Sequence, residues 1–293
     1  MTSLLYYDKV LNKESDLFKK IKRGKLIMKF GKNLLAFLMI SVMSLSLISC
    51  GEKKEQSGLD KDKLILGFDD TFVPMGFKDS NGEYVGFDID LAKAISEKLN
   101  KEIELQPIDW SMKETELKNG NIDFIWNGYS ITDERKEKVE FSTPYLNNRQ
   151  VIITLSDSEI NSKADLKDKV VGAQNQSSAV DAIEADGDTI TTFKDGKVVT
   201  FETNNEALMD LEAGRLDAVV ADEILAKYYT KQRGAEKYKI LSEDFGTEAY
   251  AVGMRKEDKD LVDAFNKAFS ELVEDGTAGE ISIKWFGEDI IAK

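Results

Sequence analysis

The sequence lacks histidine altogether and contains a single cysteine, Cys50, among its 293 residues. The chain therefore offers no histidine base and no histidine metal ligand, and one cysteine cannot form an internal disulfide. Ser-His-Asp and Cys-His catalytic arrangements are excluded, so an enzyme on this chain would depend on carboxylate, lysine or tyrosine side chains. No phosphate-binding loop or dinucleotide-binding glycine pattern occurs either, and we expect no cofactor and no metal.

No apolar run reaches the ~20 residues that are needed to cross a bilayer. Residues 34–48 form a 15-residue run that is almost wholly apolar and follows Lys29 and Lys32, which is typical of a signal-peptide core. The run ends in Leu-Ile-Ser-Cys, which resembles the bacterial lipobox. We expect residues 28–49 to be a lipoprotein signal peptide and Cys50 to carry the lipid, palmitate included. The alternative is an ordinary signal peptide with an incidental cysteine.

The residues on either side of this signal are polar. Residues 1–27 are charged and lack a core pattern, and Arg23-Gly24 could be encoded by a ribosome-binding sequence, so we hypothesise that translation starts at Met28. Residues 50–63 are predicted to be a tether that spans roughly 20 Å as a flexible coil. These features predict a lipid-anchored protein on the extracellular face of the membrane or in the periplasm.

The sequence is strongly acidic, with 40 basic and 54 acidic residues. Removing residues 1–49 leaves a net charge of about −20, because that segment carries nine basic and three acidic residues. Such a surface field does not attract nucleic acid. The remaining length of about 244 residues suits two domains of ordinary size.

From residue 64 onward, strand patterns alternate with helix patterns. We expect strands at 64–68, 102–106, 122–126, 150–154, 169–172, 217–220 and 248–254, and helices at 88–99, 112–118, 178–184, 205–213, 222–230 and 258–273. This alternation predicts an α/β fold with parallel sheets and helices on both faces. One stretch differs: residues 189–201 are predicted to form a β-hairpin around an Asp-Gly turn.

Residues 86–95 (GFDIDLAKAI) resemble the signature of the polar amino acid class of bacterial solute-binding proteins, the family 3 extracellular solute-binding proteins. Ser96 departs from that signature, which prefers a small apolar residue. Five further segments follow the order of the family: 66–69 (LGFD), 107–110 (PIDW), 131–136 (ITDERK), 216–220 (LDAVV) and 284–287 (KWFG). The resemblance covers about residues 63–288.

The resemblance implies a two-lobed periplasmic-binding-protein-like fold of type II. Lobe one would comprise 64–145 and 250–293, lobe two 151–245, and the hinge strands 146–150 and 246–249. It also implies a function: a monomeric, extracellular amino-acid-binding lipoprotein that captures a polar amino acid by lobe closure and delivers it to the permease of an ABC importer.

Arg135 is a candidate for the ligand carboxylate. It lies in the first turn of a predicted helix with Thr132 as N-cap, where a cation opposes the helix dipole. A carboxylate held bidentately would resolve that conflict. The alternative is that Arg135 pairs with Asp133, Glu134 or Glu137.

Two further candidates begin predicted helices in lobe two. Ser178 and Asp181 suggest a capping box, and free N–H groups at Ser177 and Ser178 would bind the same carboxylate. Asp222 follows the strand 217–220, and the resemblance implies that it binds the ligand ammonium group. The alternative for Asp222 is an ordinary N-cap.

The resemblance also assigns residues of lobe one. Asn127 and Gly128 would offer a backbone carbonyl and close approach, and the Ser130 hydroxyl would bond the zwitterion. Phe72 and Trp110 match positions where aromatic rings cover the ligand side chain, although each residue type is more often found in a core.

The ligand side chain would be read by Asp69 and Gln174. Asp69 accepts hydrogen bonds at neutral pH and would prefer an amide or cationic group, whereas Gln174 stands where glutamine-binding relatives place lysine. Amide, cationic and cystine-like ligands therefore remain open. Trp126 should point the opposite way from Asn127 on its strand and belong to the core.

Two rival functions are weighed against this interpretation. An enzyme of the same fold, such as a cyclic-acid dehydratase, would need a carboxylate acid or base such as Asp69 or Glu223. A sensor or adhesin would usually continue into a transmembrane segment and a signalling domain, whereas this sequence ends at Lys293.

Overall fold

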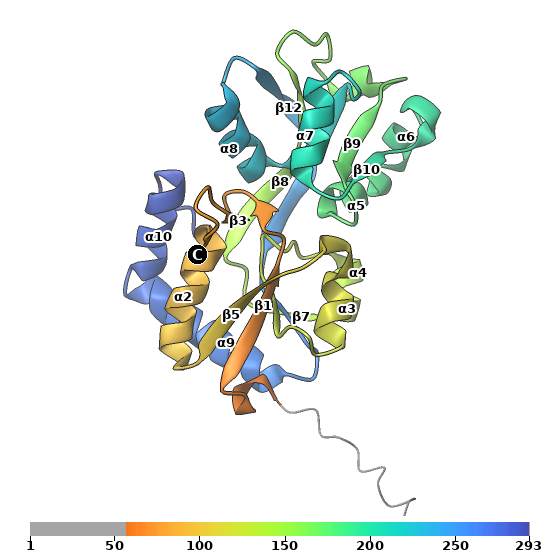
Figure 1. Cartoon of the computed structure of the whole chain (residues 1–293). Helices are drawn as coiled ribbons and strands as arrows, with labels where there is room; N and C mark the ends of the chain where they lie inside the picture. The colour runs from red at the N-terminus through yellow and green to blue at the C-terminus, as the bar shows by residue number, and fades with distance from the viewer. Residues whose placement is uncertain (1–56, 293) are drawn as a thin grey trace, which may run out of the picture. The chain divides into compact units, whose positions relative to one another are not determined.

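The computed structural model describes residues 57–292, which fold into two α/β lobes (Figure 1). The expected start at Met28, the signal peptide and the lipidation of Cys50 all lie outside the described residues. Lobe one contains η1(Gly58–Asp60), β1(Lys63–Phe68), β2(Thr71–Phe72), β3(Gly76–Lys78), β4(Tyr84–Val85), α2(Phe87–Leu99), β5(Glu102–Pro107), η2(Trp110–Met112), α3(Lys113–Lys118), β6(Phe124–Ile125), α4(Asp133–Lys138), β7(Glu140–Phe141), β13(Gly253–Met254), α9(Lys259–Glu274) and α10(Thr277–Phe286).

Lobe two lies between the two parts of lobe one in the sequence. It contains β8(Leu146–Leu155), η3(Lys163–Leu166), β9(Val171–Gln174), α5(Ser178–Ala185), α6(Gly187–Ile190), η4(Lys194–Gly196), β10(Val199–Phe201), α7(Asn204–Glu212), β11(Ala218–Asp222), α8(Glu223–Arg233) and β12(Tyr238–Tyr250).

Each lobe is built on one five-stranded sheet. The strand orders are β5-β1-β6-β13-β7 in lobe one and β10-β9-β11-β8-β12 in lobe two. The expectation of wholly parallel sheets is wrong, because β13 is antiparallel to both of its neighbours and so is β8. These are the strands that follow a crossing between the lobes, so each enters its new sheet in the reverse direction. The two-lobed type II fold is as expected.

The two crossings lie side by side. β8 and β12 pair antiparallel from Leu155 with Tyr238 to Leu146 with Tyr250, and the N–H of Tyr145 donates to Tyr250 O at 2.9 Å. The predicted strand 248–254 is therefore two strands in two sheets: β12 ends at Tyr250, and β13 begins in lobe one at Gly253.

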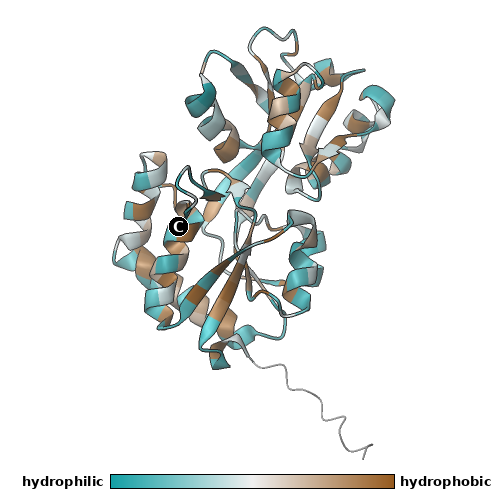
Figure 2. Cartoon of the chain, viewed as in Figure 1, coloured by the Kyte–Doolittle hydropathy of each residue, from teal (hydrophilic) through white to brown (hydrophobic). Residues whose placement is uncertain are grey.

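The helices cover the sheets with amphipathic faces. In α9, Leu261, Phe265, Phe269 and Leu272 recur at helical spacing and are all buried. Figure 2 shows hydrophobic residues concentrated on the strands and on the sides of the helices that face them. None of the helices within residues 57–292 is long and apolar enough to span a bilayer.

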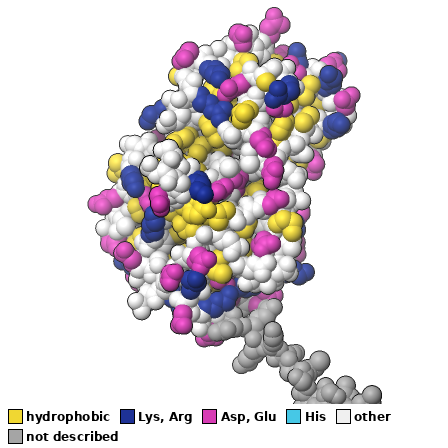
Figure 3. Space-filling view, viewed as in Figure 1, with side chains coloured by type: hydrophobic (Ala, Val, Ile, Leu, Met, Phe, Trp, Pro, Cys, Tyr) yellow, Lys and Arg dark blue, Asp and Glu magenta, His cyan; other side chains and the backbone are white. Residues whose placement is uncertain are grey.

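The surface of this unit is mixed in charge. On the face shown in Figure 3, acidic and basic side chains are interspersed, and hydrophobic side chains reach the surface mainly near the middle of the face.

The segment predicted to be a tether is folded from Ser57 onward. Gly58 is buried in η1, and its N–H donates to Asp258 Oδ1 at 2.9 Å. Lys61 Nζ lies 2.6 Å from Asp123 Oδ1, and Lys63 begins β1. The polar composition suggested an unfolded tether, but the lysine side chains of this segment pair with acidic groups of lobe one.

The predicted hairpin at residues 189–201 is wrong. Its first half is helical or turn-like, with Phe193 buried in the core of lobe two. Its second half, β10, pairs parallel with β9. The Asp195-Gly196 turn does form, with positive φ at both residues, but the preceding segment is helical and buries Phe193, so it does not pair with β10.

Candidate functional site

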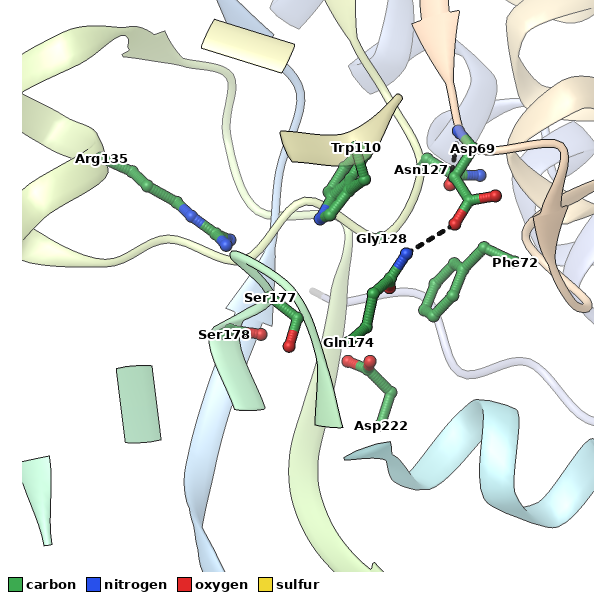
Figure 4. Close-up of a pocket in the computed structure, with 10 residues that line it drawn as sticks. All are labelled: Asp69, Phe72, Trp110, Asn127, Gly128, Arg135, Gln174, Ser177, Ser178 and Asp222. Carbon is green, nitrogen blue, oxygen red and sulfur yellow. Dashed lines mark hydrogen bonds between the residues drawn. The ribbon is translucent and has the colours of Figure 1, made fainter. Parts of the chain in front are cut away.

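A pocket between the lobes brings together ten of the eleven predicted ligand-binding residues (Figure 4). Lobe one contributes β2, η2, α4 and the segments that follow β1 and β6, and lobe two contributes the ends of β9 and β11 and the start of α5. The lining residues are Asp69, Phe72, Trp110, Asn127, Gly128, Arg135, Gln174, Ser177, Ser178 and Asp222.

Ser130 is the exception. It does not line the pocket, and its hydroxyl is hydrogen-bonded to Ser178 Oγ at 2.9 Å. Its backbone oxygen accepts from Arg135 Nη1 at 3.1 Å. Ser130 therefore links the two lobes beside the pocket and orients Arg135.

Arg135 is buried at the third position of the short helix α4. Thr132 caps this helix as predicted, since its side chain accepts from the N–H of Arg135 at 3.1 Å. Asp133 and Glu134, two of the alternative partners, pair with Lys136 and Lys138 instead. The guanidinium is thus directed into the space between the lobes rather than toward its own helix.

The surroundings of Arg135 hold it in that direction. The guanidinium stacks over the Tyr129 ring with its carbon 4.7 Å from the centroid, and Nη2 donates to Gln176 O at 3.3 Å. Its nearest carboxylate is Asp181 Oδ2 in lobe two, at 3.8 Å. This distance leaves an incompletely neutralised, buried cation at one end of the pocket.

The start of α5 faces the same end of the pocket, although not as predicted. Ser177, not Ser178, is the N-cap, and the capping box with Asp181 does not form. A tight turn with positive φ at Gln176 shifts the helix start, and the N–H of Ser177 donates to Gln174 O. The N–H of Ser178, in the first helical turn, has no acceptor within the helix.

Asp222 also lines the pocket and is buried. It occupies the N-cap position of α8, but its side chain makes no capping hydrogen bond. Its Oδ1 instead accepts from Asn148 Nδ2 at 2.7 Å and from Gln150 Nε2 at 3.0 Å. The N-cap alternative is therefore wrong, since the carboxylate turns away from the helix and into the pocket.

Four polar residues around Asp222 were not predicted from the sequence. Asn148 and Gln150 come from β8, and Glu248 and Tyr250 come from β12; the Tyr250 hydroxyl donates to Asp222 Oδ1. Desolvation, followed by the charge of Glu248, holds the pKa of Asp222 well above its usual range. The signal was the polar run just before the apolar part of β8, in which Asn148 and Gln150 share one face of the strand.

Gly128 allows close approach to the pocket. It has a φ of +61°, and an added Cβ would lie 2.7 Å from Phe72 Cε1. Its N–H donates to Asp88 Oδ2 at 2.8 Å, an oxygen that also accepts from the Tyr145 hydroxyl at 3.0 Å. Burial raises the pKa of Asp88 to about 7. Asp88, which belongs to the signature segment, thus anchors the backbone at Gly128.

Asp69 and Gln174 meet across the pocket (Figure 4). Gln174 Nε2 donates to Asp69 Oδ2 at 2.8 Å, and Gln174 Oε1 accepts from Asn204 Nδ2 at 2.9 Å. Burial is the main cause that raises the pKa of Asp69. The pocket that remains has a volume of about 10 Å³, room for about one water molecule. A larger molecule fits only if Gln174 leaves Asp69 or the lobes separate.

The aromatic residues divide between pocket and core. Phe72 and Trp110 line the pocket, whereas Trp126 is fully buried in lobe one and packs edge-to-face on Phe265 with centroids 5.1 Å apart. Asn127 follows Trp126 and points the other way, where its Oδ1 accepts from the N–H of Asp69 at 3.2 Å.

Lys113 is a second buried cation near Arg135. Its Nζ donates to Trp110 O at 3.2 Å and, across the lobes, to Gln176 O at 3.0 Å. Burial, followed by the charge of Arg135, lowers the pKa of Lys113 to about 8. Two cations of lobe one therefore converge on a single carbonyl group of lobe two.

The comparisons with known proteins agree with this geometry. A match to the family described as bacterial extracellular solute-binding proteins, family 3, covers residues 64–288. The chain belongs to this family.

Several relatives are known with the amino acid that they bind. The arginine-binding extracellular protein ArtP of Bacillus subtilis is 31% identical over 255 residues, which cover 87% of this chain and 98% of the relative. A substrate-binding protein of an ABC uptake transporter from Streptococcus pneumoniae, solved with bound histidine, is 46% identical with a TM-score of 0.78, covering 80% of this chain and 96% of that one.

Another similar structure bears on the alternative that the chain is an enzyme. It is described as an ancestral amino-acid-binding protein, a precursor of cyclohexadienyl dehydratase, and is 34% identical with a TM-score of 0.70, covering 78% of this chain and 99% of that one. Of the two carboxylates considered for acid-base chemistry, Glu223 lies outside the pocket lining and pairs with Arg149 and Lys227. Within residues 57–292, no group of three or more acidic or cysteine side chains is placed to hold a metal ion.

Proposed function

We propose that this family 3 protein captures a free α-amino acid between its lobes and presents it to an ABC importer. The observation that carries the proposal is that one pocket is lined by both Arg135, a buried cation from lobe one, and Asp222, a buried carboxylate from lobe two. An α-carboxylate beside Arg135 and an α-ammonium group beside Asp222 would each gain a charge-assisted hydrogen bond.

These two charges would provide selectivity for zwitterions. A simple acid would leave Asp222 buried without a cation, and a simple amine would leave Arg135 without an anion; either mismatch costs several kcal/mol. The start of α5 would add the backbone N–H of Ser178 as a donor beside Arg135, whereas the N–H of Ser177 already donates to Gln174 O.

The side chain of the ligand is proposed to donate hydrogen bonds. Asp69 Oδ2 now accepts from Gln174, so a ligand side chain that replaces Gln174 at this oxygen must carry a hydrogen-bond donor. A cationic or amide side chain meets this requirement, and the rings of Phe72 and Trp110 would cover its apolar part.

Closure is proposed to be driven by the ligand. Hydrogen bonds between the lobes exist at Ser130 with Ser178, at Asp69 with Gln174 and at Lys113 with the carbonyl of residue 176. A ligand that contacts both lobes favours the closed form because its full set of partners exists only there.

The proposal also covers the membrane anchor, the oligomeric state and the partner of the protein. Lipid attachment at Cys50 would leave only residues 51–56 between the membrane and the folded part, a shorter tether than the sequence suggested. The protein is proposed to act as a monomer whose closed form is recognised by the importer's permease.

Ligand-induced thermal stabilisation tests the proposed function. All the pocket residues lie within the folded unit that begins at Ser57, so protein lacking residues 1–50 is screened against the twenty amino acids and cystine. At least one polar amino acid should raise the melting temperature. R135A and D222A should each remove this effect, since leaving one buried charge unpaired costs about 3–5 kcal/mol, or roughly 10² to 10³-fold in affinity.

Exposed residues of the same types provide matched controls. R215A and D263A change an exposed arginine and an exposed aspartate outside the pocket, and both should keep the stabilisation. Circular dichroism of each unliganded variant checks that it is folded. Stabilisation retained by folded R135A or D222A would refute the assigned site.

A further inference from the structure

The carboxylate of Asp222 has a second carboxylate beside it. Glu248 Oε1 accepts from Asn148 Nδ2 at 2.7 Å and from Gln150 Nε2 at 2.8 Å. These are the same two nitrogens that donate to Asp222 Oδ1, at 2.7 and 3.0 Å. Two oxygens that share both donors are necessarily close neighbours, so the two acids form a pair.

No cation neutralises this pair within the described part of the chain. The groups that face it are Asn148 and Gln150 from β8, Tyr250 from β12 and Ser178 from α5, all of them uncharged. The nearest arginine along β8, Arg149, points to the other face of the strand and pairs with Glu223 of α8 and Asp244 of β12.

A shared proton resolves the repulsion. The oxygens of Asp222 and Glu248 that share both donors lie beside each other with no cation between them, an arrangement in which two carboxylates favour holding one proton. Burial, followed by the charge of Glu248, raises the pKa of Asp222 accordingly. Asp222 is buried, whereas Glu248 is only half-buried. The pair therefore has a route by which a proton can reach solvent from inside the site.

We infer that Asp222 and Glu248 act together as a proton-linked ammonium site, which holds one proton without ligand and releases it to solvent when a ligand ammonium group binds. This inference rests on the proposed function and assigns a binding role to Glu248. The charges balance: the ligand adds one positive charge beside the pair, and the carboxyl proton leaves through Glu248, so the pair changes from one net negative charge to two.

Proton linkage has a defined consequence for affinity. In the pH range where the free pair holds a proton and the complex does not, binding weakens about tenfold for each unit that the pH falls. At higher pH, where the free pair is already ionised, affinity becomes independent of pH. Capture is therefore strongest in neutral to alkaline surroundings, and acid favours release.

The test counts protons directly by isothermal titration calorimetry. L-arginine, L-lysine and L-glutamine are used because none of them titrates between pH 5 and 8. The one that binds most tightly at pH 8 is titrated into protein lacking residues 1–50 in pairs of buffers that differ in ionisation enthalpy. Proton release should rise toward about one proton per bound amino acid as the pH falls from 8 to 5.

Two variants distinguish proton release by the Asp222–Glu248 pair from the effect of removing any negative charge. E248Q removes one ionisable partner while keeping the shape, and should move the release profile to lower pH by about one unit or more. E236Q changes an exposed glutamate of the same lobe and should leave the profile unchanged.

The outcomes are distinct. Binding without proton release at any pH overturns the inference and leaves the proposed function intact. A release profile that is identical in wild type and E248Q also overturns it, because the proton then comes from elsewhere. If none of the three amino acids binds, the tightest binder from the thermal screen is titrated in their place, with the protons that it releases itself subtracted. If no amino acid of that screen binds, both the inference and the proposed function fail.

Discussion

Gly128 is the position where one added methyl group should disturb both the fold and the pocket. Its φ of +61° lies in the left-handed region, which costs a residue with a Cβ about 1–2 kcal/mol. In addition, the Cβ would lie 2.7 Å from Phe72 Cε1 and 3.1 Å from Tyr250 Cε2. Forcing a methyl group into a packed site costs about 1–3 kcal/mol more. We therefore expect G128A to lose about 2–5 kcal/mol of stability.

A second glycine allows the conformational cost of positive φ to be measured without crowding. Gly120 has a similar φ of +75°, but nothing lies within 4 Å of the Cβ position. G120A should therefore lose only the conformational part, about 1–2 kcal/mol. Urea unfolding of both variants and the wild type, monitored by circular dichroism, measures the difference, which reports the crowding at Phe72 and Tyr250.

The ligand provides a second measurement on the same variants. Phe72 lines the pocket, so a methyl group at residue 128 that displaces this ring should weaken amino-acid binding, whereas G120A should not. Equal losses of stability in G128A and G120A, together with unchanged binding, would refute the argument from contacts.

Three further perturbations follow from the buried charges. K113M removes the hydrogen bond to Gln176 O across the lobes and should speed dissociation of a bound amino acid about tenfold in stopped-flow measurements; an unchanged rate would mean that this bond does not hold the lobes closed. R255M leaves the fully buried Asp123 with Lys61 alone and should cost about 3 kcal/mol in urea unfolding, whereas a loss below 1 kcal/mol would contradict the role of the pair. The pKa of Asp88 is raised to about 7 by burial, so its contribution to stability is fully present below its unfolded pKa, near 4, and is lost as the pH rises toward 7. The unfolding free energy of the wild type minus that of D88N should therefore fall over this range, by at most about 1.4 kcal/mol per pH unit; a constant difference would contradict the assignment.

The pocket residues illustrate why a sequence can predict which residues line a site but not which groups their side chains contact. Asp222 was predicted to lie in the pocket, and the alternative was an N-cap. Both roles are compatible with a residue between a strand and a helix. Only the packing of β8 and β12 decides the matter, because Asn148, Gln150 and Tyr250 provide donors that turn the carboxylate away from α8.

By itself, the sequence determined the class of fold and what the chemistry excludes. Helical spacing of apolar residues predicted α2 and α9 within a residue or two, because burial of one face needs only local periodicity. The absence of histidine and of paired cysteines removed whole classes of mechanism. The signature at residues 86–95 identified the family, and Thr132 was correctly expected to cap the helix that carries Arg135.

Only the tertiary structure decided which groups meet. Residues 189–201 have a good local turn, yet β10 joins β9 in parallel at the edge of the sheet of lobe two, and the segment before the turn is helical, with Phe193 buried in the core. Glu248 lies 26 residues after Asp222, and no periodicity connects the two. The pair exists because β12 runs back beside β8 and carries Glu248 to the donors that Asp222 also uses. Contacts of this kind depend on register between strands from separate parts of the chain, which local sequence cannot specify.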